Sequence, residues 1–308
     1  MKRVLFFILL YLVFACITVK TQAFSVLVTN DDGVGAEGLS ILVEEFSRNP
    51  HLEITVIAPA ANQSGTGDDF TTGDPISVSA AATAAGYPAT AVAAYPADTV
   101  LFGVLKQMEK MPDVVVSGVN HGQNYTDYIS YSGTVGAALT AARLGIPAIA
   151  VSQGLGEDLS VASEDYRRAA VYAANLIEQL RTDWLFKLMM APGIGRDKAL
   201  VLNVNFPTCP DGAIHGIRVV PLGQFTVVTD YTLVSDDVDV QTFQAVSESL
   251  PGVPVPDCTA ATADAEPETD FDAFEKGFAS ITPLNPDQTV NFSCLSWFGF
   301  LEHIPYAR

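Results

Sequence analysis

The sequence predicts an α/β fold with a mostly parallel, Rossmann-like sheet covered by helices on both faces. Two patterns lead to this fold class. Short runs rich in Val, Ile and Leu alternate with stretches of helical period from residue 24 to residue 181. From residue 222 to residue 270 the helical period disappears and Thr, Val, Asp and Pro predominate, which indicates extended hairpins and long loops. Such a stretch is typical of an oligomerisation arm or lid, and the alternative is a set of mobile loops.

The strands are predicted where short apolar runs end at polar residues or at proline. In chain order they are 25–29, 53–58, 113–117, 147–151, 199–205 and 217–220. Residues 77–94, rich in Ala, Thr and Val, are also expected to be extended. Helices are predicted where apolar residues recur at helical spacing, over 36–46, 97–110, 134–144 and 164–181. Strands of this composition, separated by helices, favour a parallel sheet buried on both faces.

The first 23 residues have the layout of a secretory signal peptide. A basic start, Met1-Lys2-Arg3, precedes an uncharged apolar run over 4–17 and small residues near residue 23. The run is short for a transmembrane span. We expect cleavage, a secreted or periplasmic protein, and no membrane contact afterwards; the alternatives are an uncleaved anchor or a mis-assigned start codon. Lipoprotein attachment at Cys16 fits less well, because bulky Phe14 lies nearby. The predicted units are 1–23, a catalytic core over 24–220, and an arm with its return segment over 221–308.

Charge and composition exclude several classes of protein. The 308 residues include 16 Lys and Arg against 35 Asp and Glu, a net charge of −19, so a nucleic-acid polymer is not expected as a partner. A hydrophobic fraction of 49% excludes a disordered chain. In an oxidising compartment, Cys209, Cys258 and Cys294 would give one disulfide and one free thiol, with the pairing left open.

Polar residues follow three of the predicted strands, where ligands bind in parallel sheets. Asp31 and Asp32 follow the first strand, Ser64 lies in the loop after the second, and Asn120 follows the strand over 113–117. Adjacent carboxylates and neutral oxygens suit a hard divalent cation. The alternative is structural: Asp31 would cap the next helix and Asn120 would satisfy a turn.

Two further patterns involve phosphate. Gly33, Gly35 and Gly38 match a dinucleotide-binding fingerprint, but two aspartates precede them and no acidic residue ends the second strand. The segment 132–134, Ser-Gly-Thr, opens a helix whose amides could bind an anion, although, taken alone, an ordinary Ser or Thr N-cap explains it better. A cation and an anion site together would form a phosphate-ester site.

These motifs, taken in order, resemble those of the SurE family. The segments are TNDDGV (29–34), APAANQSG (58–65), VSGVNHGQN (116–124), YSGTV (131–135), TDF (269–271) and GFASITPL (277–284). The resemblance implies a three-layer α/β sandwich with a protruding C-terminal β-hairpin arm, assembled as a homodimer or homotetramer. It also implies a metal-dependent phosphatase that hydrolyses nucleoside 5′- or 3′-monophosphates. The residues over 222–268 match the family only loosely, and an export signal is uncommon in it.

The resemblance assigns roles residue by residue. The metal ligands for one Mg²⁺ or Mn²⁺ per subunit would be Asp31, Asp32, Ser64 and Asn120. The phosphate pocket would be lined by Asn124, Ser132, Gly133 and Thr134, with Asn30 and Gly33 shaping the loop between. Asp31 and Asp32 would be catalytic, Asp31 as general base or as nucleophile. A non-catalytic exported nucleotide- or metal-binding protein is the alternative.

Overall fold

The computed structural model describes residues 23–193, 197–224, 230–237, 240–246, 255–286 and 292–307. The predicted signal segment up to residue 22, with Cys16, lies outside these ranges, as does the side chain of Cys294. Within the same ranges, no helix combines the length and the apolar character needed to cross a membrane.

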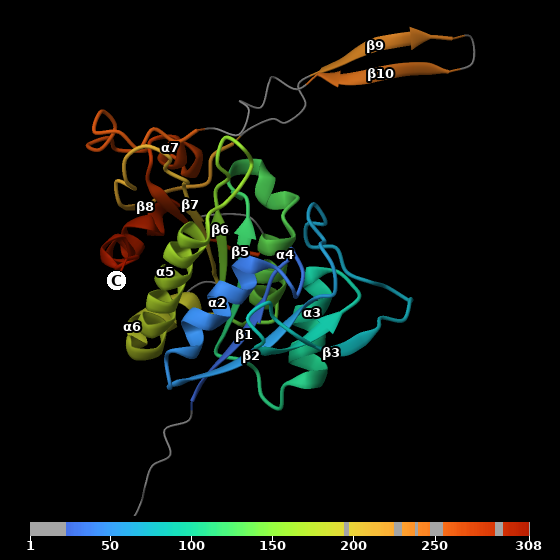
Figure 1. Ribbon diagram of the computed structural model, residues 1–308, viewed down its shortest axis with the longest axis vertical. Coiled ribbons are helices and arrows are strands. Elements are labelled where there is room, and N and C mark those ends of the chain that lie inside the picture. The colour runs from blue at the N-terminus through green and yellow to red at the C-terminus, as the bar shows by residue number, and fades with distance from the viewer. Residues whose placement is uncertain are drawn as a thin grey trace, which may run out of the picture.

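A nine-stranded, mostly parallel sheet forms the centre of the molecule (Figure 1). Its strand order is β3-β4-β2-β1-β5-β6-β7-β11-β8. The series from β4 to β7 is parallel, whereas β3 pairs antiparallel with β4 and β11 pairs antiparallel with β7. The bounds are β1 Phe24–Thr29, β2 Leu52–Pro59, β3 Val78–Ala82, β4 Pro88–Val92, β5 Val114–His121, β6 Ala148–Gln153, β7 Val201–Phe206, β8 Ile217–Val219 and β11 Ala279–Leu284.

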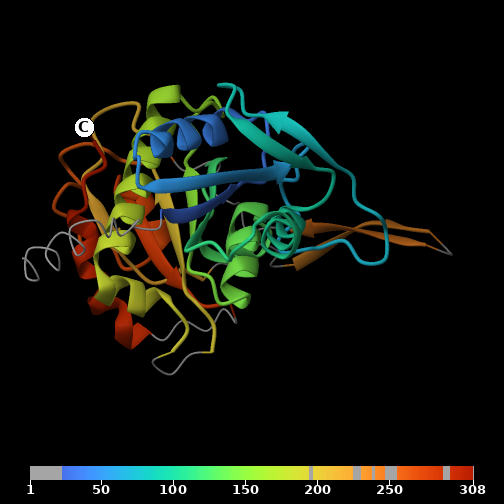
Figure 2. The ribbon, with the colours of Figure 1, turned by 90° about the horizontal axis from the view of Figure 1, so that it is seen from below.

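Helices cover both faces of this sheet, which confirms the predicted three-layer sandwich (Figure 2). One face packs against α2 (Glu37–Ser47), α5 (Ser163–Thr182) and α6 (Trp184–Met190). The other packs against α3 (Pro96–Phe102) and α4 (Gly133–Arg143). Alternation along the buried strands explains the two cores, because Val26 and Val28 belong to the first and Leu27 to the second.

Two predicted elements differ clearly in extent, and some elements of the structure were not predicted. The helix predicted over 97–110 ends at Phe102 and continues as a π-helix, η1 (Gly103–Gln107). The strand predicted to end at residue 117 runs on to His121. Helix α6 was not predicted, because its apolar residues span only two turns and imitate a short buried strand.

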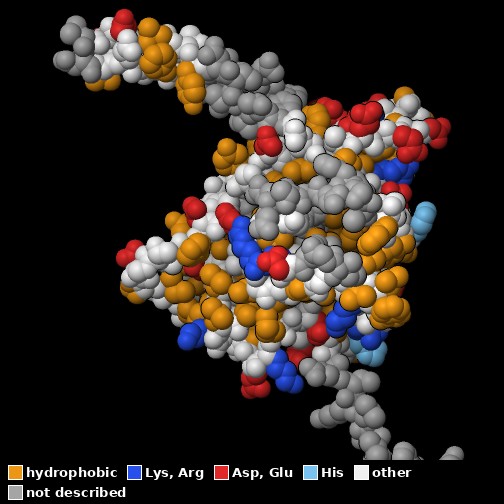
Figure 3. All heavy atoms as spheres, turned by 180° about the vertical axis from the view of Figure 1, so that it is seen from behind, with side chains coloured by type: hydrophobic (Ala, Val, Ile, Leu, Met, Phe, Trp, Pro, Cys, Tyr) orange, Lys and Arg blue, Asp and Glu red, His pale blue; other side chains and the backbone are white. Residues whose placement is uncertain are grey.

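The C-terminal region contains a two-stranded antiparallel hairpin of β9 (Asp230–Asp236) and β10 (Gln241–Val246), which projects from the body (Figure 1). Its exposed side chains include Leu233, Val234 and Phe243, and hydrophobic side chains are visible along it in Figure 3. The chain then returns through α7 (Asp270–Glu275) to β11, which lies between β7 and β8, and ends in a 3₁₀-helix, η3 (Phe292–His303). The predicted protruding hairpin is therefore present.

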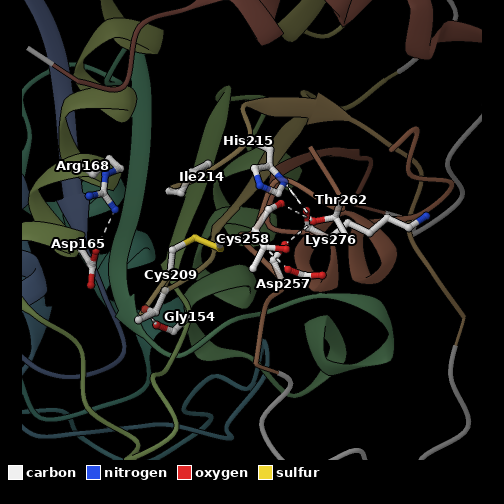
Figure 4. Close-up of a disulfide and its surroundings, with 12 residues drawn as sticks. Gly154, Asp165, Arg168, Cys209, Ile214, His215, Asp257, Cys258, Thr262 and Lys276 are labelled. Carbon is white, nitrogen blue, oxygen red and sulfur yellow. Dashed lines mark hydrogen bonds and ion pairs between the residues drawn. A yellow bond between two sulfur atoms is a disulfide. The ribbon is translucent and has the colours of Figure 1, made fainter. Parts of the chain in front are cut away.

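One disulfide joins Cys209 to Cys258, as Figure 4 shows, so the prediction of one disulfide is confirmed. The two Cα atoms are 5.7 Å apart and 49 residues separate the cysteines. The bond connects the segment after β7 with the segment that returns from the arm. In the chain-entropy account, closing a loop of this length stabilises a fold by about 4 kcal/mol.

Candidate functional site

The site begins where β1 and β5 end side by side. These strands are parallel neighbours, with Thr29 opposite Ser117, so the residues that follow them meet at one edge of the sheet. Asp32 Oδ2 accepts a hydrogen bond of 3.0 Å from the backbone amide of His121, the residue after Asn120. The structure therefore brings Asp31, Asp32 and Asn120 together.

A bulge near the end of β5 determines how Asn120 is presented. Ser117 pairs with Ala150 and Asn120 with Ser152, so β5 uses one more residue than β6 between these pairs. A bulge of this kind re-aims the side chains that follow it. The Asn120 amide nitrogen donates to Gly122 O at 2.8 Å, while its Oδ1 receives no hydrogen bond from any described residue.

Asp31 lies against the N-terminus of α4. Its Oδ1 accepts a hydrogen bond of 2.5 Å from Thr134 Oγ1, and its side chain is only 3% exposed. Gly133 permits this approach, because a Cβ atom there would lie 2.8 Å from Asp31 Cβ and 3.1 Å from its Oδ2. A carboxylate at a helix N-terminus faces the positive end of the helix dipole.

Burial makes this pair of carboxylates electrostatically costly. Desolvation, with a smaller contribution from Asp32, raises the pKa of Asp31 to about 6 despite the Thr134 hydrogen bond. Burial also raises the pKa of Asp32, against the lowering effect of the His121 amide and ring. Among the described residues, neither aspartate forms an ion pair with Lys or Arg.

The donor set fits a hard divalent cation. The buried carboxylate of Asp31 and the half-buried one of Asp32 have no described Lys or Arg partner, and they lie next to an amide oxygen without a hydrogen bond. Together they offer the oxygen ligands that Mg²⁺ and Mn²⁺ prefer. No group of three or more His, Cys, Asp or Glu side chains suited to a metal occurs in the described ranges. The candidate set has only two such residues, because its other members are Ser64 and Asn120.

Ser64 lies on the exposed rim of this site, in the loop after β2. That loop is connected to the aspartates through its backbone, since the Gln63 amide donates to Asp31 O at 2.7 Å. Gly33, with a φ of +102°, packs against the same loop, where a Cβ atom would lie 3.1 Å from Ala61 C. The contacts therefore place the Ser64 loop beside the Asp31 turn.

The remaining predicted residues have structural contacts of their own. Asn30 shapes the turn, because its Nδ2 donates to Gly33 O at 2.9 Å and its Oδ1 accepts from Gly33 N at 3.3 Å. Ser132 caps α4 by accepting from Val135 N at 3.1 Å. Asn124 is held at the ends of β6 and β7. Its side-chain Nδ2 donates to Ser152 Oγ at 2.9 Å, and its backbone amide donates to Asn205 Oδ1 at 2.7 Å.

Sequence reasoning missed two contributors near Asp32. His121 supplies its backbone amide to Asp32, and both of its ring nitrogens are engaged, with Tyr166 Oη at 2.7 Å and Leu159 O at 3.1 Å. Burial, followed by the nearby Asp32 charge, raises the pKa of Tyr166, so its hydroxyl stays protonated beside the imidazole. Nothing in the α5 sequence distinguishes Tyr166 from an ordinary core residue.

Known proteins are similar to this chain in sequence and in fold. A family model described as survival protein SurE matches residues 26–228. A 5′-nucleotidase SurE of Aeromonas hydrophila subsp. hydrophila is 36% identical over 276 residues, 89% of this chain and 96% of that protein. A 5′/3′-nucleotidase SurE of Photorhabdus laumondii subsp. laumondii is 33% identical over 265 residues, 86% of this chain and 91% of that protein. The crystal structure of the SurE protein from Aquifex aeolicus, 28% identical, covers 90% of this chain and 99% of its own with a TM-score of 0.64. The chain therefore belongs to the SurE family.

Proposed function

We propose that this protein is a divalent-metal-dependent phosphomonoesterase that hydrolyses nucleoside 5′- and 3′-monophosphates to nucleoside and phosphate. The observation that carries the proposal is the Asp31–Asp32 pair beside the N-terminus of α4, in which Asp31 is buried and neither carboxylate has a described Lys or Arg partner. The relatives named 5′-nucleotidase and 5′/3′-nucleotidase support the choice of substrate.

In this proposal Asp31, Asp32, Ser64 and Asn120 hold one Mg²⁺ or Mn²⁺. The cation would supply a Lewis acid that polarises the phosphate and acidifies water. The chain itself orients the reacting groups: Thr134 fixes the Asp31 carboxylate, and the His121 amide fixes Asp32. The first turn of α4 presents backbone amides toward the phosphate. We assign Asp31 the general-base role because of its central position.

A panel of nucleoside 5′- and 3′-monophosphates, assayed for phosphate release with Mn²⁺ or Mg²⁺, tests this function. Turnover of at least one nucleotide is the expected result. Binding without turnover would instead identify a non-catalytic nucleotide-binding protein. The dinucleotide alternative is disfavoured because Asp31 and Asp32 directly precede the first glycine, where their carboxylates would face the negative charge of a pyrophosphate.

Substituting Gly133 tests whether the close approach of α4 to Asp31 matters for the reaction. A Cβ atom at Gly133 would push against Asp31 and against Pro96 Cγ, which would lie 3.0 Å away. We expect Gly133→Ala to lower kcat/KM for p-nitrophenyl phosphate by about 10- to 100-fold, the cost of displacing a catalytic group by about 1 Å. Gly35→Ala is the control, since a Cβ there meets nothing within 4 Å. Unchanged kinetics in Gly133→Ala would exclude this role for the contact.

We also propose export and self-association. Strand β1 begins at Phe24, so cleavage after residue 23 would leave the sheet complete, and the Cys209–Cys258 disulfide suits an oxidising compartment. N-terminal sequencing of exported protein should read from Phe24; a retained segment 1–23 would contradict cleavage.

The exposed apolar side chains of the arm support a homodimer or homotetramer, which sedimentation velocity would distinguish from a monomer.

A further inference from the structure

A buried carboxylate connects the arm to the site. Asp270, at the start of α7, is fully buried, and no described Lys, Arg or His forms an ion pair with it. Its Oδ1 accepts from the amides of Gly223 at 2.8 Å and Phe271 at 2.9 Å. Its Oδ2 accepts from the amide of Thr126 at 3.0 Å. Three segments distant in sequence therefore meet at one side chain.

The Thr126 contact fixes the entry to the phosphate side of the site. Thr126 begins the short 3₁₀-helix η2 (Thr126–Ser130), which leads directly to Ser132 and the N-terminus of α4. Its φ of +50° is uncommon for a β-branched residue and persists only where the surroundings impose it. Asn124 is held separately by β7, so the hold on η2 comes from a different part of the fold.

Helix α7 makes a second contact with the loop that contains Thr126, through the neighbouring Tyr125. The Tyr125 ring lies 5.2 Å from the rings of both Phe271 and Phe274, measured between centroids. The aromatic contacts and the Thr126–Asp270 hydrogen bond both join this loop to α7, so moving α7 would move η2.

Gly223 lies in the segment that leads from β8 to the arm, and we call its residues 221–224 the root of the arm. Gly223 packs directly against Thr126 and Asp270. A Cβ atom at Gly223 would lie 3.0 Å from Thr126 Cγ2 and 3.1 Å from Asp270 Oδ1. The absence of a side chain therefore allows the root of the arm to reach both the carboxylate and the site loop. In Figure 1 the hairpin projects from the same end of the molecule as α7.

We propose that Asp270 is a positioning residue that holds η2 against the root of the arm, and thereby sets the geometry of Ser132, Gly133 and Thr134 for phosphate binding. This inference rests on the proposed phosphomonoesterase function. It assigns the arm a second role, because a displacement of its root at Gly223 would reach the phosphate site through one carboxylate. Three backbone amides donate hydrogen bonds to the Asp270 carboxylate, and these bonds offset part of the free-energy cost of burying its charge.

Asp270→Asn tests the proposal, because an asparagine keeps the shape but replaces one acceptor oxygen with an NH₂ group that faces an amide. We expect the inhibition constant for inorganic phosphate and the KM for p-nitrophenyl phosphate to rise about tenfold, with kcat changed less. The control is Asp272→Asn on the same helix, whose carboxylate accepts from the amide of Glu268 and pairs with Lys276. Its inhibition constant for phosphate and its KM should stay within twofold of the wild-type values. A merely stabilising Asp270 would leave the phosphate constant of the folded protein unchanged, and that result would overturn the proposal.

Hydrogen exchange separates this inference from the proposed function. Amides in 125–131 and 221–224 should exchange faster in Asp270→Asn, whether or not the protein hydrolyses phosphate esters. Unchanged exchange there would contradict the Asp270 contact, whereas a wild type without turnover would contradict the proposed function.

If Asp270→Asn fails to fold, Gly223→Ala provides the test with the carboxylate intact. It should raise the inhibition constant for phosphate about three- to tenfold, by pressing on Thr126 and Asp270. Gly299→Ala, where a Cβ meets nothing within 4 Å, should have no effect. A wild-type phosphate constant in Gly223→Ala would again overturn the proposal.

Discussion

Replacing either Asp31 or Asp32 with Asn is expected to lower kcat/KM for p-nitrophenyl phosphate by about 1000-fold or more, because a neutral amide holds a divalent cation far more weakly than a carboxylate does. The fold should survive both changes. An asparagine at position 31 can still accept the Thr134 hydrogen bond, and one at position 32 can still accept the His121 amide. Steady-state kinetics with saturating Mn²⁺ measure the loss.

The control for this experiment is Asp74→Asn, an exposed aspartate in the loop before β3. Its activity should stay within twofold of the wild type, and far-ultraviolet circular dichroism should show that all three variants are folded. Undiminished turnover in both Asp31→Asn and Asp32→Asn would remove this pair from the mechanism.

The same substitution at Asp31 is expected to stabilise the metal-free protein. The folded-state pKa of Asp31 is raised by burial from 3.8 to about 6, so the native state binds this proton more tightly than the unfolded chain does. The associated stability is fully present below pH 3.8 and is lost as the pH rises through about 6. Raising a carboxyl pKa by this amount corresponds to about 3 kcal/mol.

Asp31→Asn removes this cost, so its free energy of unfolding in EDTA should exceed that of the wild type by up to about 3 kcal/mol at pH 7.5. The difference should disappear near pH 4. Urea unfolding at both pH values measures it, with Asp74→Asn as the variant that shows no pH-dependent gain. Adding Mn²⁺ should reduce this difference in free energy of unfolding, because the cation stabilises the wild type, which binds it, more than Asp31→Asn. Equal stabilities at pH 7.5 without metal would contradict a free-energy cost of burying the Asp31 carboxylate.

The alternation of apolar strands with helices was enough to predict the sandwich, because burial on both faces leaves a strong local pattern. The meeting of Asp31, Asp32 and Asn120 followed from one rule, that parallel strands end at the same edge of a sheet. Where the structure adds to the prediction, the determinants are non-local. The extension of β5 to His121 depends on a bulge against β6, and the partner of Cys209 depends on where the chain returns from the arm.

Asp270 is a further residue whose contacts could not be predicted from the sequence, because they are non-local. Its motif, TDF, indicated a C-terminal signature but gave no contact, since the amides of Gly223 and Thr126 are 47 and 144 residues away in the chain. Thr134 is a related case: as part of the YSGTV motif it was assigned to phosphate binding, and its hydroxyl donates to Asp31. The sequence pattern identified these residues as important, and only the fold shows which atoms they contact.

A metal titration tests whether the site at Asp31 and Asp32 needs a divalent cation for turnover. The mature protein, starting at Phe24, is dialysed exhaustively against EDTA, freed of chelator, and assayed for phosphate release from nucleoside 5′- and 3′-monophosphates while Mn²⁺ or Mg²⁺ is added back. Turnover should be lost on chelation and restored by either cation in a saturable manner. Full turnover after exhaustive chelation would contradict this dependence on a cation.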